Sequence, residues 1–376
     1  MNLRKDKWSK VALLDVCELI NGRAYSAHEL LTEGTPVLRV GNFFTNDKWY
    51  YSDLKLEDKK YCNNGDLLYA WSASFGPRIW EGGKVIFHYH IWKVDVSEKI
   101  AKQFLYYVLE SETKKIKASS HGTTMPHITK AAMEKHTIPL PSLYEQKQIA
   151  SLFQSIETAM EQVDGQEKHL KALQKSLCTG LFSKEPVFGN LLTSKNYTAT
   201  SFGEIAECDK TYPEHEKEIS RFVGLEFIEA ENFQLQGWGE IANGTTFSKR
   251  FVTGDVLFGK RRAYLKKVAV ADFDGICSGD ILVIRAKAKK MLQGLLPYYI
   301  SADAFIQHAV STSAGSLSPR TKWKDLSELE VSIPDLKTQE KILEVLKQLD
   351  NAVNQLKQQK ITLKHLKQKL LNEILG

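Results

Sequence analysis

The chain has 376 residues with 43% hydrophobic and 10% aromatic content, which is enough to form compact cores and favours two domains over one. Its net charge of +6 is mild and indicates an anionic partner only weakly. The five cysteines are scattered without a C-x-x-C pair, so we expect neither disulfides nor structural zinc. No apolar run approaches the roughly 18 residues that span a bilayer, and the first residues lack the apolar stretch of a signal peptide. We therefore expect a cytoplasmic protein without a membrane span.

The first half is predicted to contain a mixed module and a long helix. Over residues 1–140, short runs of β-branched and aromatic residues are separated by Gly and Asp turns, which is typical of strands, and one helical pattern covers Lys99 to Lys117. Residues 141–182 carry the periodicity of a continuous helix. A Ser/Thr-rich linker with Pro and Gly is predicted at 183–199.

The second half repeats this order. Residues 200–333 show the same alternation of short strands and turns, with a helical pattern from Met291 to Val310, and residues 334–376 form a second predicted long helix. The fold class is therefore α+β, in which two mixed modules are each followed by one long helix.

An internal duplication supports this organisation. Pro141 to Phe182 aligns without a gap on Pro334 to Leu375, at a constant offset of 193. The modules match more loosely: the strand beginning at Gly65 aligns with the one at Gly254, and the segment around Gly122 with the one around Gly315.

Both long helices carry apolar residues at seven-residue spacing, as in one seam of a coiled coil. A second apolar set, three positions further on in each heptad, is interrupted at the same place in both copies by a glutamine, Gln166 or Gln359. Each glutamine either marks the register from a buried position or faces solvent. The expected seam and partner-binding positions are Gln146, Ile149, Ile156, Val163, Leu170 and Leu177 in the first helix and Gln339, Ile342, Leu349, Leu356, Leu363 and Leu370 in the second.

A single amphipathic helix usually packs on the core of its own domain. Two matched helices of about 40 residues, each about 60 Å long, exceed what a domain of this size can cover. We therefore expect the two helices to pair with each other as an antiparallel coiled coil. Their duplicated outer faces predict two equivalent binding sites for a partner protein.

These features together resemble the specificity subunit of type I restriction-modification enzymes. The resemblance rests on the duplicated order of modules and helices and on the junction from Ile138 to Ile149, IPLPSLYEQKQI, which is echoed from Val331 to Ile342. The second copy has Thr338 where the first has Glu145, so the resemblance assigns no common role to that acid.

The resemblance implies that each module is a target-recognition domain that reads one part of a split, asymmetric site in double-stranded DNA. It also implies that the paired helices bind two methyltransferase subunits, and that restriction subunits join through the complex. This chain would bind no cofactor itself, because S-adenosylmethionine, ATP and magnesium would belong to those partner subunits.

In the second module, the segment from Lys249 to Lys267 holds seven cations beside one acid, Asp255. Cations of this density suit phosphates, and arginine can bridge O6 and N7 of guanine, although a solvated basic turn has the same composition. The candidate DNA-binding residues here are Lys249, Arg250, Lys260, Arg261, Arg262, Tyr264, Lys266 and Lys267.

The first module has an aromatic and hydroxyl-rich segment at the corresponding place, where Trp71 and Trp80 fit a core role as well as a contact role. Two Gly-Thr or Gly-Ser segments further on suit either phosphate positioning or plain turns. The candidates in these segments are Ser72, Ser74, Arg78, Thr123, Thr124, His127, Ser316, Arg320 and Lys322.

No catalytic motif is found in the sequence. There is no Pro-Pro of a methyltransferase signature and no P-loop, and His88 with His90 lacks a third metal ligand, so we predict neither catalytic residues nor a metal site. A coiled-coil scaffold whose two modules bind proteins fits the helices equally well. The basic segment from Lys249 to Lys267 favours the DNA-binding alternative.

Overall fold

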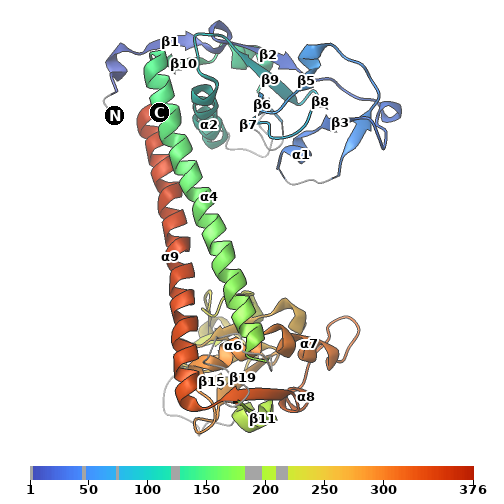
Figure 1. Cartoon of the computed structure of the whole chain (residues 1–376), viewed down its shortest axis with the longest axis vertical. Helices are drawn as coiled ribbons and strands as arrows, with labels where there is room; N and C mark the ends of the chain where they lie inside the picture. The colour runs from blue at the N-terminus through green and yellow to red at the C-terminus, as the bar shows by residue number, and fades with distance from the viewer. Residues whose placement is uncertain (1–2, 45–47, 73–75, 120–127, 183–196, 209–218) are drawn as a thin grey trace. The chain divides into compact units, whose positions relative to one another are not determined.

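A computed structural model describes residues 3–44, 48–72, 76–119, 128–182, 197–208 and 219–376. The chain divides into two compact units. Unit 1 contains residues 1–163 and 359–376, and unit 2 contains residues 164–358. Each long helix therefore contributes one part to each unit (Figure 1).

Unit 1 contains two four-stranded sheets and a short ribbon that joins the module to its helix. The first sheet has the order β2-β9-β6-β7 and the second β4-β3-β8-β5, in which β3 and β8 run parallel. The ribbon pairs β1 with β10. The strands are β1 (Ser9–Ala12), β2 (Cys17–Asn21), β3 (Thr35–Leu38), β4 (Tyr50–Ser52), β5 (Tyr61–Cys62), β6 (Leu67–Ala70), β7 (Gly76–Ile79), β8 (Val85–Phe87), β9 (Ile91–Val96) and β10 (Thr137–Leu140).

Unit 2 repeats this topology strand for strand. Its sheets have the orders β12-β19-β16-β17 and β14-β13-β18-β15, with β13 parallel to β18, and its ribbon pairs β11 with β20. The strands are β11 (Tyr197–Ser201), β12 (Ala206–Cys208), β13 (Arg221–Val223), β14 (Gly239–Glu240), β15 (Lys249–Phe251), β16 (Val256–Gly259), β17 (Val268–Val270), β18 (Gly275–Cys277), β19 (Ile281–Ala286) and β20 (Glu330–Pro334). The modules thus share more than the loose outline expected from sequence.

A Gly-Asp pair opens the same central strand in both units. Gly65 and Gly254 have φ values of +86° and +91°, a backbone conformation that favours glycine. The aspartate that follows accepts a hydrogen bond from the turn and pairs with a cation on the neighbouring strand, and for Asp66 this cation is Lys93 at 3.0 Å. The motif seen in the sequence therefore fixes the start of β6 and β16.

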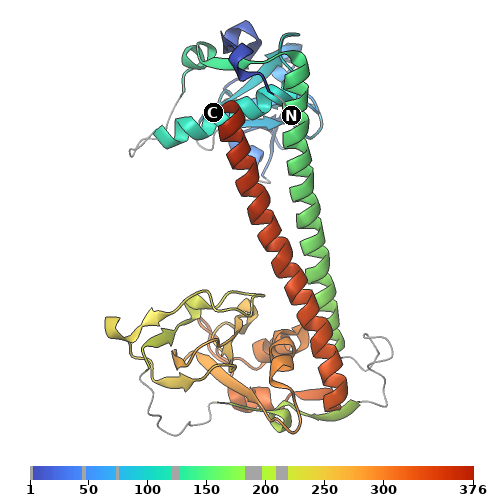
Figure 2. The ribbon, with the colours of Figure 1, turned by 90° about the vertical axis from the view of Figure 1, so that its left-hand side faces the viewer.

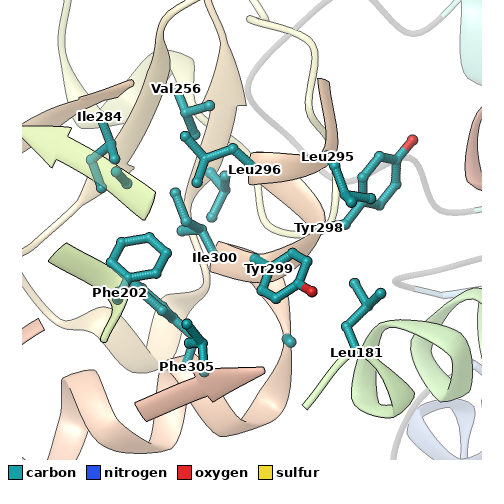
Figure 3. Packing of buried hydrophobic residues seen from close by; sticks show 14 of the residues in the cluster. Leu181, Phe202, Val256, Ile284, Leu295, Leu296, Tyr298, Tyr299, Ile300 and Phe305 are labelled. Carbon is teal, nitrogen blue, oxygen red and sulfur yellow. The ribbon is translucent and has the colours of Figure 1, made fainter. Parts of the chain in front are cut away.

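The helices of each module cover the first sheet and form the larger cores. In unit 2, Phe202, Phe305 and Tyr299 pack with the strand residues Val256 and Ile284 (Figure 3). The helices are α1 (Val40–Phe44), α2 (Lys102–Ser119), α3 (Lys130–Glu134) and α4 (Leu143–Gly180) in the first half, and α5 (Phe202–Ile205), α6 (Leu296–Ser301), α7 (Asp303–Ser311), α8 (Trp323–Ser327) and α9 (Leu336–Leu375) in the second.

The two long helices, of 38 and 40 residues, are paired within each unit (Figure 2). In unit 1, Ile149 and Phe153 near the start of α4 share a core with Leu371 near the end of α9. In unit 2, Leu177 near the end of α4 shares a core with Ile342 near the start of α9. The helices therefore run antiparallel, as the sequence predicted.

Both long helices begin with a side-chain cap, but the capping residues differ. At the start of α4, Ser142 Oγ accepts a hydrogen bond from the Glu145 amide at 3.3 Å, and the Glu145 carboxylate accepts from Ser142. At the start of α9, Asp335 accepts from both the amide and the hydroxyl of Thr338. The carboxylate of the cap therefore comes from Glu145, three residues after the capping serine, in α4, and from the capping residue Asp335 itself in α9.

Within the described part of the chain, none of the helices is long and apolar enough to cross a membrane.

Candidate nucleic-acid interface

The two modules present different side chains at one equivalent place, where the central strand β6 or β16 ends. In unit 1 the Trp71 amide donates to the His90 carbonyl at 3.0 Å, and in unit 2 the Lys260 amide donates to the Asp280 carbonyl at 2.9 Å. This shared main-chain contact places an aromatic group beside a histidine in unit 1. It places a basic segment beside an aspartate in unit 2.

In unit 2, two segments that lie more than 50 residues apart in sequence form one surface. The Arg262 amide donates to the Pro319 carbonyl at 2.8 Å, and the Thr321 amide donates to the Lys260 carbonyl at 3.1 Å. Arg261 and Arg320 form an isolated antiparallel bridge between the segments. The structure therefore joins the basic segment and the Gly-Ser segment, which were predicted separately, into one candidate interface.

Asp280 organises the arginines of this surface. Arg320 donates to both Asp280 carboxylate oxygens, at 2.7 and 3.2 Å, and Arg261 lies 3.7 Å from the same carboxylate. The hydrogen bond from Arg320 holds the pKa of Asp280 below its usual value, so the carboxylate stays ionised. Asp280 thus fixes two guanidinium groups in place while their outer edges stay accessible.

The exposed side chains of the surface include cations, an aromatic ring and a hydroxyl. Arg262 and Tyr264 protrude from the segment after β16, where Arg262 adopts a left-handed backbone conformation with φ of +54°. Such a set can bind phosphates and hydrogen-bond to base edges. The expected residues that are exposed here are Arg262, Tyr264, Ser316, Arg320 and Lys322, with Lys260 and Arg261 half-exposed.

Three of the expected cations form contacts within their own module. Lys249 donates to the Ile281 carbonyl at 2.7 Å, and Lys267 to the Leu225 carbonyl at 2.6 Å. Lys266 forms an ion pair of 2.6 Å with Asp303 on α7. Lys266 and Lys267 hold the loop in shape, and Lys249 ties β15 to β19. Their place in the DNA-binding set stays a prediction, as does that of Arg250, which lies half-buried on β15.

The acid expected within the basic segment also has a different role. Asp255 is buried and forms a bidentate ion pair with Arg285 on β19, one of its contacts being 2.9 Å. The acids that meet the basic segment are Asp280 and Asp303, which sequence analysis missed because both lie far along the chain. The Ser278-Gly279-Asp280 turn before β19 was the signal available for Asp280.

The equivalent surface of unit 1 is aromatic. The Trp71 indole nitrogen donates to the Tyr89 carbonyl at 2.8 Å, and its ring stacks on the buried Trp92 with centroids 5.8 Å apart. Ser72 is buried, which corrects its expected contact with DNA, whereas Arg78 on β7 is exposed. Trp80 donates to a carbonyl in its own loop and is half-buried, so both tryptophans help to stabilise the module while part of each ring stays accessible.

The candidates Ser74, Thr123, Thr124 and His127 lie outside the described residues. His88 and His90 have ring centroids 5.0 Å apart, beside the exposed ring of Tyr89. Burial lowers the pKa of His88 to about 4, so this ring is neutral at neutral pH and adds no charge to the surface. Among the residues that the structure describes, no group of three or more His, Cys, Asp or Glu side chains could hold a metal ion.

The apolar residues of the expected seam are all buried or half-buried. The buried seam residues are Ile149, Ile156, Val163, Leu177 and Ile342, and the half-buried ones are Leu170, Leu349, Leu356, Leu363 and Leu370. Gln166 and Gln359 are exposed, which excludes the buried alternative for both.

Gln146 and Gln339, by contrast, are fully buried against their own modules. This burial corrects their expected role in binding a partner. Two pairs of leucines at equivalent positions are exposed: Leu143 with Leu336 at the helix starts, at 46% and 36%, and Leu173 with Leu366 further along, at 47% and 42%.

The sequence matches one protein family twice. Residues 5–172 and 194–365 each match the type I restriction modification DNA specificity domain. The chain belongs to this family. The duplicated match confirms the predicted fold class and supports two DNA-specificity domains rather than the modules of a protein-binding scaffold.

Known relatives of this specificity subunit agree over most of its length. It is 24% identical to the type I restriction enzyme MjaVIII specificity subunit of Methanocaldococcus jannaschii, covering 98% of this chain and 92% of that protein. It is 27% identical to the EcoDI specificity subunit of Escherichia coli, covering 66% of this chain and 63% of that protein.

The fold of this specificity subunit also has solved counterparts. It superposes on the S subunit of a type I restriction-modification system from M. genitalium with a TM-score of 0.59 and 16% identity, over 100% of this chain and 98% of that one. A chain from a structural study of type I complex assembly gives a TM-score of 0.60 at 17% identity, over 97% of each chain. Both similarities bear on the fold alone.

Proposed function

We propose that this subunit reads a bipartite, asymmetric site in double-stranded DNA, with one half-site bound by each module. The observation that carries the proposal is the equivalent position of the two surfaces, at the end of β6 and of β16, combined with their different chemistry. Equivalent positions suit the same task in both modules. Different side chains suit two unlike half-sequences.

The two half-sites would be bound by different forces. In unit 2, Arg261, Arg262 and Lys322 supply charge for phosphates and fork-shaped donors for guanine. In unit 1, Arg78 supplies one exposed charge, and the aromatic group around Trp71 supplies none. The contact in unit 1 therefore depends less on salt.

We infer that the chain performs no chemistry of its own. Methylation would be carried out by partner subunits that bind S-adenosylmethionine, and cleavage by restriction subunits that use ATP and magnesium. This chain would supply the sequence specificity of the complex, because it would bind DNA and the partner subunits at the same time. Because the proposed target is chromosomal DNA, we place the complex in the cytoplasm.

The exposed leucines of the long helices support two methyltransferase sites. Leu173 in unit 2 and Leu366 in unit 1 are related by the repeat offset of 193, and each is more than two-fifths exposed. Equivalent apolar positions on duplicated helices suit two copies of one partner, bound by extension of the helix pair into a larger bundle.

The test of DNA recognition is to co-express the chain with its methyltransferase and to map methylated positions across the host genome. We expect one motif with two unlike specified halves and an unspecified gap. Arg261→Ala with Arg262→Ala should relax one half and leave the other unchanged. A contiguous motif, or loss of both halves together, would contradict the assignment of one half to each module.

The number of partners is tested by native mass measurement of the reconstituted complex. We expect two methyltransferase copies per chain, reduced to one by either Leu173→Asp or Leu366→Asp. A wild-type complex with one copy would exclude two equivalent sites.

A further inference from the structure

Leu317 stands out among the exposed apolar side chains of the described residues. It is 88% exposed, the largest fraction among the large hydrophobic side chains found exposed there. It lies at the tip of the loop between Ala314 and Arg320 and does not belong to the hydrophobic cores of unit 2. Leaving a leucine in water forgoes the free energy of its burial, so the side chain does nothing for the fold at this position.

The loop holds this side chain in a defined place. Ala314 and Arg320 exchange two main-chain hydrogen bonds of 3.0 Å, and Gly315 makes the turn with φ of +109°. On the other side, the Arg261 guanidinium donates to the Ser318 hydroxyl at 3.1 Å. A fixed loop with an unused apolar tip is pre-organised for contact with another molecule.

The surroundings of the tip are cationic. Arg262 approaches the Leu317 carbonyl at 3.4 Å, and Arg261 and Arg320 flank the loop through Ser318 and Asp280. A polyanion requires cations in the surface that binds it, and arginine can both neutralise phosphates and hydrogen-bond to bases. Three guanidinium groups around one leucine therefore suit nucleic acid.

We propose that Leu317 selects thymine in the half-site bound by unit 2, by apolar contact with the 5-methyl group of that base in the major groove. The methyl group is the apolar feature that base pairs present in this groove, where the other groups are hydrogen-bond donors and acceptors. A leucine side chain forms no hydrogen bonds and therefore distinguishes bases by this methyl group. The inference rests on the proposed function, because it assigns one base contact within that surface.

The test uses the full chain in complex with its methyltransferase and a pool of random DNA duplexes. We compare the sequences enriched by the wild type, by Leu317→Ser and by a matched control, Leu14→Ser, which changes a leucine of unit 1 that is 54% exposed. With Leu317→Ser, one thymine position in one half-site should become degenerate. The control should leave every position specified.

A second measurement isolates the methyl group. Deoxyuridine in place of that thymine should weaken wild-type binding about 4-fold, the effect of one buried methyl-sized group. The same replacement should not weaken binding by Leu317→Ser. Thermal unfolding of both variants should match that of the wild type, because the substituted side chains are exposed.

Several outcomes would overturn the assignment. An unchanged consensus with Leu317→Ser excludes thymine selection by this residue, and loss of methyltransferase binding with an unchanged consensus assigns the loop to a protein contact. Equal sensitivity of both proteins to deoxyuridine excludes the methyl contact. A wild-type complex that enriches no sequence would overturn the proposed function itself, and this assignment with it.

Discussion

Gln146 and Gln339 occupy equivalent positions in the two long helices and form the same three hydrogen bonds in their own units. The Gln146 side chain accepts from the Ala101 amide at 2.7 Å and donates to the carbonyls of Lys99 and Pro141 at 3.2 and 2.9 Å. The corresponding bonds of Gln339 join the amide of Leu292, at 2.9 Å, and the carbonyls of Lys290 and Pro334, at 2.8 and 2.9 Å. Each glutamine therefore fastens a long helix to its module.

Replacing either glutamine by alanine should destabilise its unit strongly. The substitution leaves one amide and two carbonyls in a buried place without their partner, and each such group costs about 1 to 3 kcal/mol. We expect Gln146→Ala to lower the free energy of unfolding by about 3 kcal/mol in urea denaturation. Gln166→Ala, an exposed glutamine on the same helix, should change it by less than about 0.5 kcal/mol.

Lys367 should be the main ionic contact between α9 and the rest of unit 1. Its ammonium lies 2.8 Å from Glu110 on α2 and 2.7 Å from Glu157 on α4, and Glu157 also accepts from the Tyr107 hydroxyl. Lys367→Met should cost about 2 kcal/mol, because two half-buried carboxylates lose their cation. Lys367→Arg should restore most of the loss, measured by urea denaturation.

The equivalent position in unit 2 offers a neutral comparison. Gln174 donates to Asp350 at 2.5 Å, and Asp350 also accepts from the Tyr298 hydroxyl. Gln174→Met leaves Asp350 its tyrosine partner and should cost less than Lys367→Met. A larger loss with Gln174→Met would contradict the ionic explanation.

The Lys367 contact should also weaken at alkaline pH. Burial lowers the pKa of Lys367, but the Glu110 and Glu157 carboxylates outweigh burial and raise it above the ordinary 10.5. A lysine with a raised pKa contributes stability that is complete below the unfolded pKa and is lost as pH rises through the folded one. The difference in unfolding free energy between wild type and Lys367→Met should therefore shrink above about pH 10.5. A constant difference between pH 8 and pH 11.5 would contradict this.

The arginines of unit 2 should set the salt dependence of DNA binding. Arg261→Ala with Arg262→Ala should reduce the slope of log affinity against log salt by up to about 2, because each lost phosphate contact removes about 0.9 from the slope. Lys289→Ala with Lys290→Ala removes the same charge at the opposite end of β19 and should leave the slope nearly unchanged. Equal effects of the two pairs would indicate attraction by net charge alone.

Asp280 should restrain non-specific binding. Asp280→Asn removes the carboxylate that holds Arg320 and Arg261, which frees both guanidinium groups for phosphates. We expect tighter binding to random DNA, a salt slope steeper by about 0.9, and a smaller ratio of specific to non-specific affinity. The control is Asp272→Asn, which makes an equal change of charge after the end of β17, the strand that follows the basic segment. In filter-binding measurements it should leave that ratio unchanged.

The sequence predicted the parts of the fold that depend on local periodicity. The long helices extend over Leu143–Gly180 and Leu336–Leu375, close to the predicted ranges, because the seven-residue spacing of apolar residues continues from Ile149 to Leu177 and from Ile342 to Leu370. The Gly-Asp pairs at Gly65 and Gly254 marked the start of a strand in both modules, because a positive φ restricts the choice of residue.

For the candidate interface, the sequence predicted that the segment is basic but not which of its cations face outward. Lys249, Lys266 and Lys267 carry the same charge as Arg261 and Arg262, so the sequence could not separate them. The separation depends on acceptors from distant segments, such as Asp303 on α7 for Lys266 and the Ile281 carbonyl for Lys249.

By itself, then, the sequence determined the duplication, the order of modules and helices, and the family. The tertiary structure decided which cations face outward, which glutamines are buried, and that the loop of Leu317 lies beside Arg261. The physical reason is that repeats and periodicity are properties of neighbouring residues, whereas exposure and charge pairing depend on contacts between residues far apart in the chain.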